Sequence, residues 1–148
     1  MIYKRVSTFY ICPTPIGNLE DTSNRIIETL KFVDLIYCED TRRASKFTNN
    51  FSIETPLKSF FLGNEFKRNE EINQHLLEGK NIALISDAGT PLISDPGTEL
   101  VRYLISNEHN IVSIPGPSSV LTALTVSGFE LNEFQFLGFI PKAGKEKE

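Results

Sequence analysis

The sequence lacks several features that would assign it to a familiar class of protein. Among 148 residues there are two cysteines, Cys12 and Cys38, with no CxxC pair and no partnering histidine cluster. A zinc site or a disulfide is therefore disfavoured, and because each cysteine ends an apolar run, both are predicted to be buried hydrophobes. No apolar run is long enough to cross a bilayer, and no signal peptide follows Met1–Arg5. We therefore expect a cytoplasmic protein with no membrane partner.

Three sequence motifs of common enzyme folds are also missing. No GxxxxGK[ST] follows a predicted strand, no GxGxxG opens the first helix, and there is no GxSxG. These absences disfavour a phosphate-cradling NTPase, a dinucleotide-binding fold and an α/β hydrolase. The two histidines, His75 and His109, do not form a pair, and we expect both to be solvated rather than catalytic. No metal site is predicted.

The charge balance excludes a generally basic surface. Asp and Glu number 19 against 15 Lys and Arg, which gives a net charge of −4 at pH 7. A nucleic-acid partner would therefore need a local basic patch. The hydrophobic share of 40% and the charged share of 23% are those of an ordinary globular protein, and the length favours a single domain.

Short apolar runs alternate with helical patterns along most of the chain. This alternation predicts βαβ units and an α/β fold with a mostly parallel sheet flanked by helices. The predicted strands are Thr8–Cys12, Val33–Cys38, Thr55–Phe61, Asn81–Ile85 and Ile111–Ile114. The predicted helices are one capped by Asp21 or Thr22 with the stripe Ile26, Ile27 and Leu30, a short one opened by residues 39–43, and Asn64–Glu78, Thr98–Asn107 and Ser118–Ser127.

The end of the chain has a different character. Residues 134–140 are apolar and aromatic, whereas residues 141–148 offer nothing to pack. We therefore expect a domain over residues 1–140, the start of an interdomain linker over 141–148, and a second domain that this chain does not contain.

Three loops that leave predicted strands share an unusual composition. Residues 14–18, 86–97 and 115–119 are rich in glycine, proline and small hydroxyl side chains. Glycine lets main-chain amides approach a ligand closely, and proline limits the entropy lost on binding. In an open parallel sheet, ligands bind beyond the carboxyl ends of the strands. Although glycine and proline often only punctuate turns, three such loops at equivalent strand ends predict a binding site for an adenosine and amino-acid moiety.

These loops carry the resemblance to a known family. The segments PTPIGNLED (13–21), CEDTR (38–42), SDAGTPLISDPG (86–97) and PGPS (115–118) resemble the ribosomal RNA small-subunit methyltransferase I family, which is similar in fold to the tetrapyrrole methylases. The resemblance implies a five-stranded, mostly parallel sheet, a second α/β domain and a homodimer. It also implies S-adenosylmethionine bound in the cleft between the domains, so that the isolated half would be inactive. The implied reaction methylates the ribose 2′-hydroxyl of a cytidine in 16S rRNA of the small ribosomal subunit.

The resemblance also assigns residues, position by position. The residues that it and the loops predict to bind the cofactor are Pro15, Gly17, Asp87, Ala88, Gly89, Thr90, Ile93, Ser118 and Ser119. The candidates for catalysis, as bases or groups facing the substrate, are Glu39, Asp40, Arg42 and Asp95. Where the family pattern leads us to expect histidines before Asn64, this chain has Phe61 and Gly63.

Substrate binding leaves alternatives open. Arg42, Arg43 and Lys46, with Lys67 and Arg68, could bind RNA phosphates or form an ordinary solvated face. A methylase of a tetrapyrrole or another small molecule, and a non-catalytic nucleotide-binding half-domain, are the competing hypotheses. The first loop reads TPIGN rather than a Gly-x-Gly-x-Gly-Asp type, which favours RNA.

Overall fold

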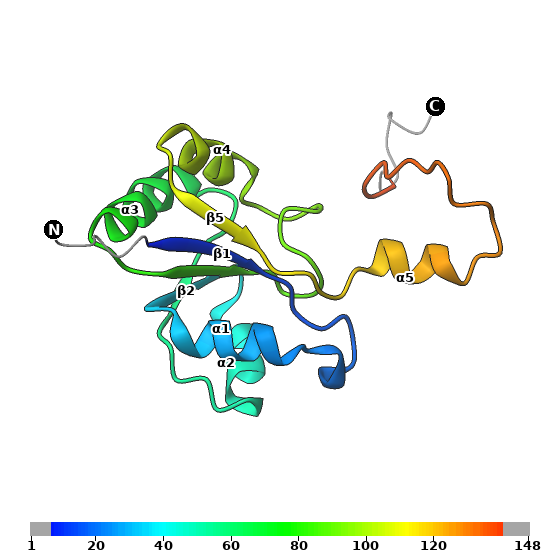
Figure 1. The fold of residues 1–148 in the computed structure, drawn as a ribbon, viewed down its shortest axis with the longest axis horizontal. Helices are drawn as coiled ribbons and strands as arrows, with labels where there is room; N and C mark the ends of the chain where they lie inside the picture. Colours follow the sequence, from blue (N-terminus) through cyan, green and yellow to red (C-terminus); the bar gives the residue numbers. More distant parts are fainter. Residues whose placement is uncertain (1–6, 141–148) are drawn as a thin grey trace, which may run out of the picture.

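A computed structural model describes residues 7–140 and contains the predicted parallel sheet (Figure 1). Within that range five strands are all parallel, in the order β3-β2-β4-β1-β5. Their bounds are β1 Thr8–Cys12, β2 Leu35–Cys38, β3 Leu57–Ser59, β4 Ile82–Ile85 and β5 Asn110–Ser113. Since every strand runs the same way, all five carboxyl ends lie at one edge of the sheet.

Helices cover both faces of this sheet (Figure 1). Buried side chains of α1 and α2 pack on one face, and those of α3 and α4 pack on the other. The helices are α1 Asn24–Phe32, α2 Thr41–Asn50, α3 Glu65–Leu77, α4 Thr98–Ser106 and α5 Ser119–Thr125, with a 3-10 turn η1 at Leu19–Asp21. The chain is therefore a three-layer α/β domain, as its alternating pattern predicted.

The central strands β2, β4 and β1 are mostly apolar because both of their faces are covered. In β1, Phe9 and Ile11 pack with α3 and α4, whereas Cys12 packs with α1 and α2. The two cysteines, Cys12 and Cys38, are free and buried, which confirms their predicted role as small hydrophobes. Burial of this kind raises the pKa of each thiol to about 12, so neither is a reactive thiolate at neutral pH.

Some helix details differ from the prediction. The cap of α1 is Ser23, whose side chain accepts a hydrogen bond from the Ile26 amide, and not Asp21 or Thr22. Asp21 instead belongs to the 3-10 turn η1, and Asn18 is the cap of that turn. The second strand begins at Leu35 rather than Val33, since Val33 serves as the carboxyl cap of α1.

Neither histidine is simply solvated as predicted. The imidazole of His109 lies 2.7 Å from the amide oxygen of Asn73, and burial lowers the pKa of this imidazole. His75 lies 3.2 Å from the Lys80 ammonium and 3.5 Å from the Glu78 carboxylate. Both are partly buried at the end of the sheet away from the three loops, so their role is structural.

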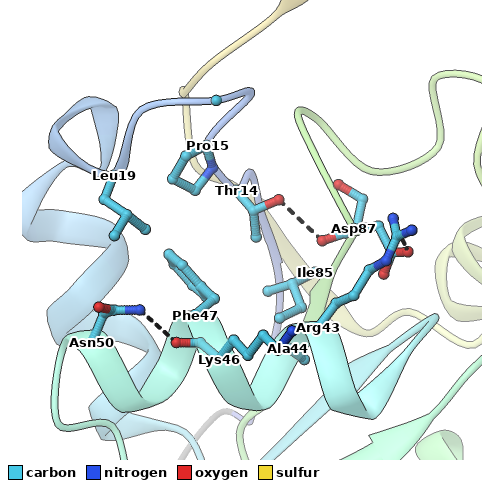
Figure 2. Close-up of a pocket in the computed structure, with 12 residues that line it drawn as sticks. Thr14, Pro15, Leu19, Arg43, Ala44, Lys46, Phe47, Asn50, Ile85 and Asp87 are labelled. Carbon is cyan, nitrogen blue, oxygen red and sulfur yellow. Dashed lines mark hydrogen bonds and ion pairs between the residues drawn. The ribbon is translucent and has the colours of Figure 1, made fainter.

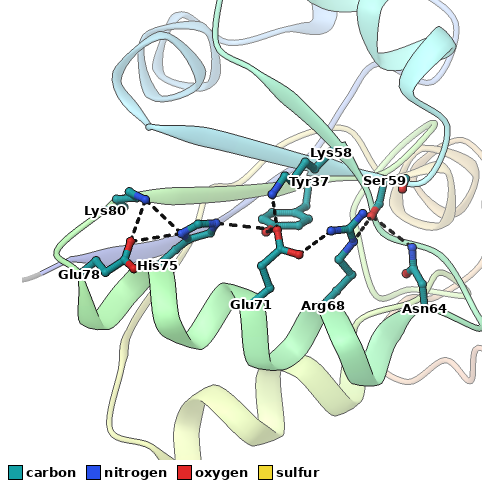
Figure 3. A network of polar contacts seen from close by, with 9 residues as sticks. All are labelled: Tyr37, Lys58, Ser59, Asn64, Arg68, Glu71, His75, Glu78 and Lys80. Carbon is teal, nitrogen blue, oxygen red and sulfur yellow. Dashed lines mark hydrogen bonds and ion pairs between the residues drawn. The ribbon is translucent and has the colours of Figure 1, made fainter.

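A polar network fastens α3 to the sheet through Glu71 (Figure 3). Its carboxylate accepts hydrogen bonds from the Tyr37 hydroxyl on β2 at 2.8 Å and from the Lys58 ammonium on β3. Arg68, one turn earlier on α3, pairs with the same carboxylate and donates to the Ser59 carbonyl at 3.0 Å. The network holds β3, the short edge strand, in register beside α3.

The segment after β5 stands apart from the three layers (Figure 1). Among the described residues, α5 contributes no buried side chain, and Phe139 and Ile140 are 86% and 84% exposed. Residues 141–148, where the linker was predicted, lie outside the described residues. Over the described part of the chain, no helix is both long and apolar enough to span a membrane.

Candidate functional site

The strand order places a topological switch between β1 and β4. From β1 the chain crosses through α1 toward β2, and from β4 it crosses through α4 toward β5 on the opposite side. The two connections also use opposite faces of the sheet, because α1 and α4 belong to different layers. Loops that diverge in this way leave a crevice at the carboxyl edge, which is where open α/β sheets bind ligands. The first two Gly/Pro loops leave these two strands.

Hydrogen bonds join these two loops directly. The backbone amide of Thr14 donates to the Gly89 carbonyl at 2.9 Å, and the Gly89 amide donates to the Thr14 carbonyl at 3.0 Å. The Thr14 hydroxyl donates to the Ser86 carbonyl at 3.0 Å, and the Ser86 hydroxyl donates to the Gly89 carbonyl at 2.8 Å. The loops after β1 and β4 therefore form one rigid unit.

The third loop is attached to the same unit. The Thr90 hydroxyl donates to the Pro117 carbonyl at 3.0 Å. At Gly116, an added Cβ would lie 2.7 Å from the ring of Pro13, so only glycine allows this approach. Gly89 has a φ of +83°, and an added Cβ there would lie 3.4 Å from Ile16. All three predicted loops thus meet at one edge of the sheet.

Three acidic side chains gather beside the joined loops. Burial raises the pKa of Glu39, and the charges of Asp87 and Asp95 raise it further. Burial also raises the pKa of Asp95, again with a contribution from Asp87. Glu39 and Asp95 line the same small void of about 10 Å³. The cluster draws one member from the end of β2 and two from the loop after β4.

The other two candidates for catalysis, Asp40 and Arg42, are paired with each other. Arg42 donates to both carboxylate oxygens of Asp40, at 3.1 Å from Nε and 2.8 Å from Nη2. Asp40 also caps α2 by accepting from the Arg42 amide at 2.9 Å. These hydrogen bonds hold the pKa of the Asp40 carboxyl well below its usual range. Asp40 is therefore a poor proton acceptor and a good helix cap.

A pocket of about 250 Å³ lies between the first loop and α2 (Figure 2). Figure 2 shows Phe47 rising from α2 toward Pro15 and Leu19, with Arg43 reaching across to Asp87. The Arg43 guanidinium lies 3.1 Å from the Asp87 carboxylate. The pocket's lining residues are Thr14, Pro15, Gly17, Leu19, Arg43, Ala44, Lys46, Phe47, Asn50, Ile85, Ser86 and Asp87.

The predicted cofactor residues fall on two sides of the bridge between Thr14 and Gly89. Those that line the pocket are Pro15, Gly17 and Asp87. Gly89 and Thr90 contact the third loop, and Ser118 opens α5, where its hydroxyl accepts from the Leu121 amide. Those that are exposed are Ala88 and Ile93 on the second loop and Ser119, the first residue of α5. The structure gathers all nine at one edge without placing them around one pocket.

The predicted basic patch is smaller than its sequence suggested. Arg68 is not available to RNA, because its side chain is only 20% exposed and is held by Glu71 and the Ser59 carbonyl. Arg42 is 88% exposed but paired with Asp40. Lys46 makes no ion pair within residues 7–140. The cations left facing the pocket are Arg43 and Lys46.

The sequence interpretation missed the residues of α2 that line the pocket together with these cations. Phe47 and Asn50 follow Arg43 at intervals of four and three, so they share one face of α2. This spacing could have been used to predict from the sequence that Phe47 and Asn50 lie beside Arg43. Leu19 could not be found in this way, because it reaches the pocket only through η1.

This fold, with its three joined loops, is that of a methylase class. The family model described as Tetrapyrrole (Corrin/Porphyrin) Methylases matches residues 8–148, and the chain belongs to this family. The crystal structure of uroporphyrin-III-C-methyltransferase from Thermus thermophilus covers 86% of this chain, and this chain covers 54% of it, with a TM-score of 0.63 and 17% identity. The α/β prediction is confirmed.

Closer sequence relatives share one name, Ribosomal RNA small subunit methyltransferase I. The protein from Bacillus subtilis (strain 168) is 48% identical over 139 residues, which is 94% of this chain and 48% of the relative. The protein from Halalkalibacterium halodurans is 46% identical over 140 residues, covering 95% and 48%. That from Thermotoga maritima is 47% identical over 137 residues, covering 93% and 61%. The resemblance predicted from the loop motifs is confirmed, and the chain spans about half the length of the first two relatives.

Proposed function

We propose that the protein methylates small-subunit ribosomal RNA with S-adenosylmethionine, at the ribose 2′-hydroxyl of a cytidine. The observation that carries this proposal is the fusion of three loops at the switch point, through the Thr14–Gly89 and Thr90–Pro117 hydrogen bonds. The relatives named above support the substrate class, since all three are named as ribosomal RNA methyltransferases. A single conformation of these loops would present a fixed main-chain surface to the methyl donor.

The residues at this edge fit the proposed cofactor. When bound, S-adenosylmethionine supplies a methyl group on a positively charged sulfonium. The carboxylates of Glu39, Asp87 and Asp95 stand together at the loop edge, and a nearby cation would lower their mutual repulsion. Gly89 is buried against Ile16 and Pro117, so its lack of a side chain lets the second loop pack closely on the first and the third.

The chain's own chemical task is to align the ribose hydroxyl and remove its proton. Holding two reacting groups in near-attack geometry can lower a barrier by about 7 kcal/mol or more. A carboxylate with a raised pKa is a stronger base than an ordinary one, and Glu39 and Asp95 have this property. We propose that one of these two accepts the proton, while Asp40 and Arg42 brace the start of α2.

We propose that the protein acts in the cytoplasm as a homodimer, on 16S rRNA within the small ribosomal subunit. We further propose that a second domain, joined through the linker predicted at residues 141–148, completes the cofactor site. The target ribose would have to leave its helix to reach the loops, because a duplex shields it.

Transfer of a radioactive methyl group tests the proposed function. The full protein is incubated with tritiated S-adenosylmethionine and one of three acceptors: unmethylated small ribosomal subunits, free 16S rRNA or a porphyrin precursor. The proposal predicts label in ribosomal RNA, at a ribose that then resists alkaline cleavage. Label in the porphyrin alone would contradict it, and label in none of the three would favour a binding module.

A further inference from the structure

The pocket between the first loop and α2 has one apolar side and one charged side. Its apolar surface comes from Pro15, Leu19 and Phe47, which converge in Figure 2, with Ile85 at the base. Phe47 is 9% exposed and Leu19 is 44% exposed, so the wall formed by η1 remains accessible. The volume of the pocket, about 250 Å³, is below the usual range for pockets that bind drug-sized ligands, which begins at ~300 Å³. One base or nucleoside fits such a space better than an entire cofactor.

The charges around the pocket select the kind of ligand. Arg43 and Lys46 on α2 are the cations of the lining, and the one acidic lining residue, Asp87, already pairs with Arg43. Lys46 is exposed and makes no ion pair with any residue that the structure describes. A sulfonium would be repelled by Lys46, whereas a phosphate would be attracted to it. The pocket therefore suits an anionic nucleotide, while the cluster of Glu39 and Asp95 suits a cation.

A polar side chain stands beside the apolar wall. Asn50, the last residue of α2, donates from Nδ2 to the Lys46 carbonyl at 2.6 Å. Its Oδ1 makes no hydrogen bond within residues 7–140 and can accept one from a ligand. Apolar contact combined with an edge acceptor is the usual means of reading a splayed-out RNA base.

From this arrangement we infer that the α2 pocket holds a single unstacked RNA nucleotide, with its base against Leu19 and Phe47 and its phosphate at Lys46. This inference rests on the proposed function, because it names where the RNA substrate enters. Asp87 lines the pocket and also belongs to the acidic cluster with Glu39 and Asp95, so the pocket adjoins that cluster. A nucleotide seated there would direct its ribose to the side where the proposed base stands.

Two substitutions in the full protein test this inference. Leu19→Ala removes the accessible apolar wall, and Lys46→Ala removes the unpaired cation. Lys31→Ala on α1 is the matched control, since Lys31 is an exposed helical lysine outside the pocket. Each variant is first checked for an unchanged melting temperature. Affinity is then measured for unmethylated small ribosomal subunits and, by calorimetry, for S-adenosylhomocysteine.

We expect Leu19→Ala to weaken subunit binding about ten-fold, which is the scale of losing the burial of part of a leucine side chain. Lys46→Ala should weaken it by a similar factor and reduce the slope of log K against log salt by about 0.7, as for one single-strand phosphate contact. Affinity for S-adenosylhomocysteine should stay within two-fold in both variants. Weaker binding of S-adenosylhomocysteine, or unchanged binding of the subunits, would overturn the inference. Wild-type protein that methylates no ribosomal RNA would instead refute the proposed function.

Discussion

Thr14 and Gly89 exchange two backbone hydrogen bonds, at 2.9 and 3.0 Å, across the point where the chain reverses its direction of winding. This pair of bonds is an isolated antiparallel bridge added beyond the ends of two parallel strands. It extends the sheet into the loops and restricts both of them. Less conformational entropy is then lost when a ligand binds, which is the general benefit of preorganisation.

Gly89→Ala should damage this junction. Alanine at a φ of +83° is strained by about 1 kcal/mol, and its Cβ would lie 3.4 Å from Ile16. We expect a lower melting temperature and weaker binding of S-adenosylhomocysteine by calorimetry. Gly79→Ala is the matched control, because Gly79 has a φ of +86° with no atom within 4 Å of the added Cβ. The control should lose stability alone; equal affinities in both variants would contradict the proposed role of the junction.

Thr90→Val should loosen the third loop from the second. Valine keeps the shape of threonine but cannot donate to the Pro117 carbonyl, a bond of 3.0 Å. A lost hydrogen bond of this kind costs about 1 kcal/mol, and we expect at least part of it to appear as reduced affinity for S-adenosylhomocysteine. Thr29→Val provides the comparison, since the Thr29 hydroxyl bonds only its own helix, to Arg25 at 2.7 Å. Identical affinities for the two variants would argue against coupled loops.

Loss of the proposed base, by Glu39→Gln or by Asp95→Asn, should slow methyl transfer by about a hundred- to ten-thousand-fold, the usual contribution of a positioned base. Since the base must be deprotonated, wild-type kcat/KM should fall as the pH drops through the pKa that burial and Asp87 raise above its ordinary value. Asp95→Asn is measured in parallel, because the pKa of Asp95 is raised too. Glu28→Gln, an exposed change on α1, serves as the control. A normal rate of methyl transfer in both the Glu39 and the Asp95 variant would show that neither carboxylate accepts the proton.

Glu71→Gln should lower the free energy of unfolding at neutral pH by about 2 to 3 kcal/mol, given the size of the pKa shift at this carboxyl. Burial acts to raise this pKa, but hydrogen bonds from Lys58, Tyr37 and Arg68 outweigh it and lower it to about 2. The wild-type stabilisation is therefore present above the ordinary pKa of 4.5 and is lost as the pH falls toward 2. Denaturant unfolding between pH 7 and 2 measures this. A difference between wild type and variant that persists unchanged at pH 2 would contradict the assignment.

The layers of this fold could be predicted from sequence because strand burial leaves a direct pattern. The strand Thr8–Cys12 was predicted with its observed bounds, since both of its faces are covered and the run after Thr8 is mostly apolar. The cap at Ser23 was not predicted, because two neighbouring polar residues offered equally good capping chemistry. Phe66 lies in the first turn of α3 and is apolar, yet it is 91% exposed. Helical periodicity predicts the face of a helix on which a residue lies, but it does not show whether a neighbouring element covers that position.

The candidate site, too, could be predicted only in part from the sequence. Loop composition was enough to predict that three loops share a function, because glycine and proline mark the backbone shapes that bring loops together. Their two sides could not be separated from sequence, because the Thr14–Gly89 bridge is a long-range contact. Arg68 was placed in a basic patch although its partner Glu71 lies only three residues away on α3, because helical spacing alone does not show which ion pairs form. Which cations remain unpaired depends on the packed structure.

We propose that the second and third of the joined loops hold the methyl donor, on the other side of the Thr14–Gly89 bridge from the α2 pocket. A crystal structure of the full protein with S-adenosylhomocysteine tests this most directly. We expect contacts from Gly89 and Thr90 in the second loop and from Ser118 or Ser119 after the third, with the α2 pocket free of the cofactor. Cofactor density on another edge of the sheet, or within the pocket beside Phe47, would contradict it.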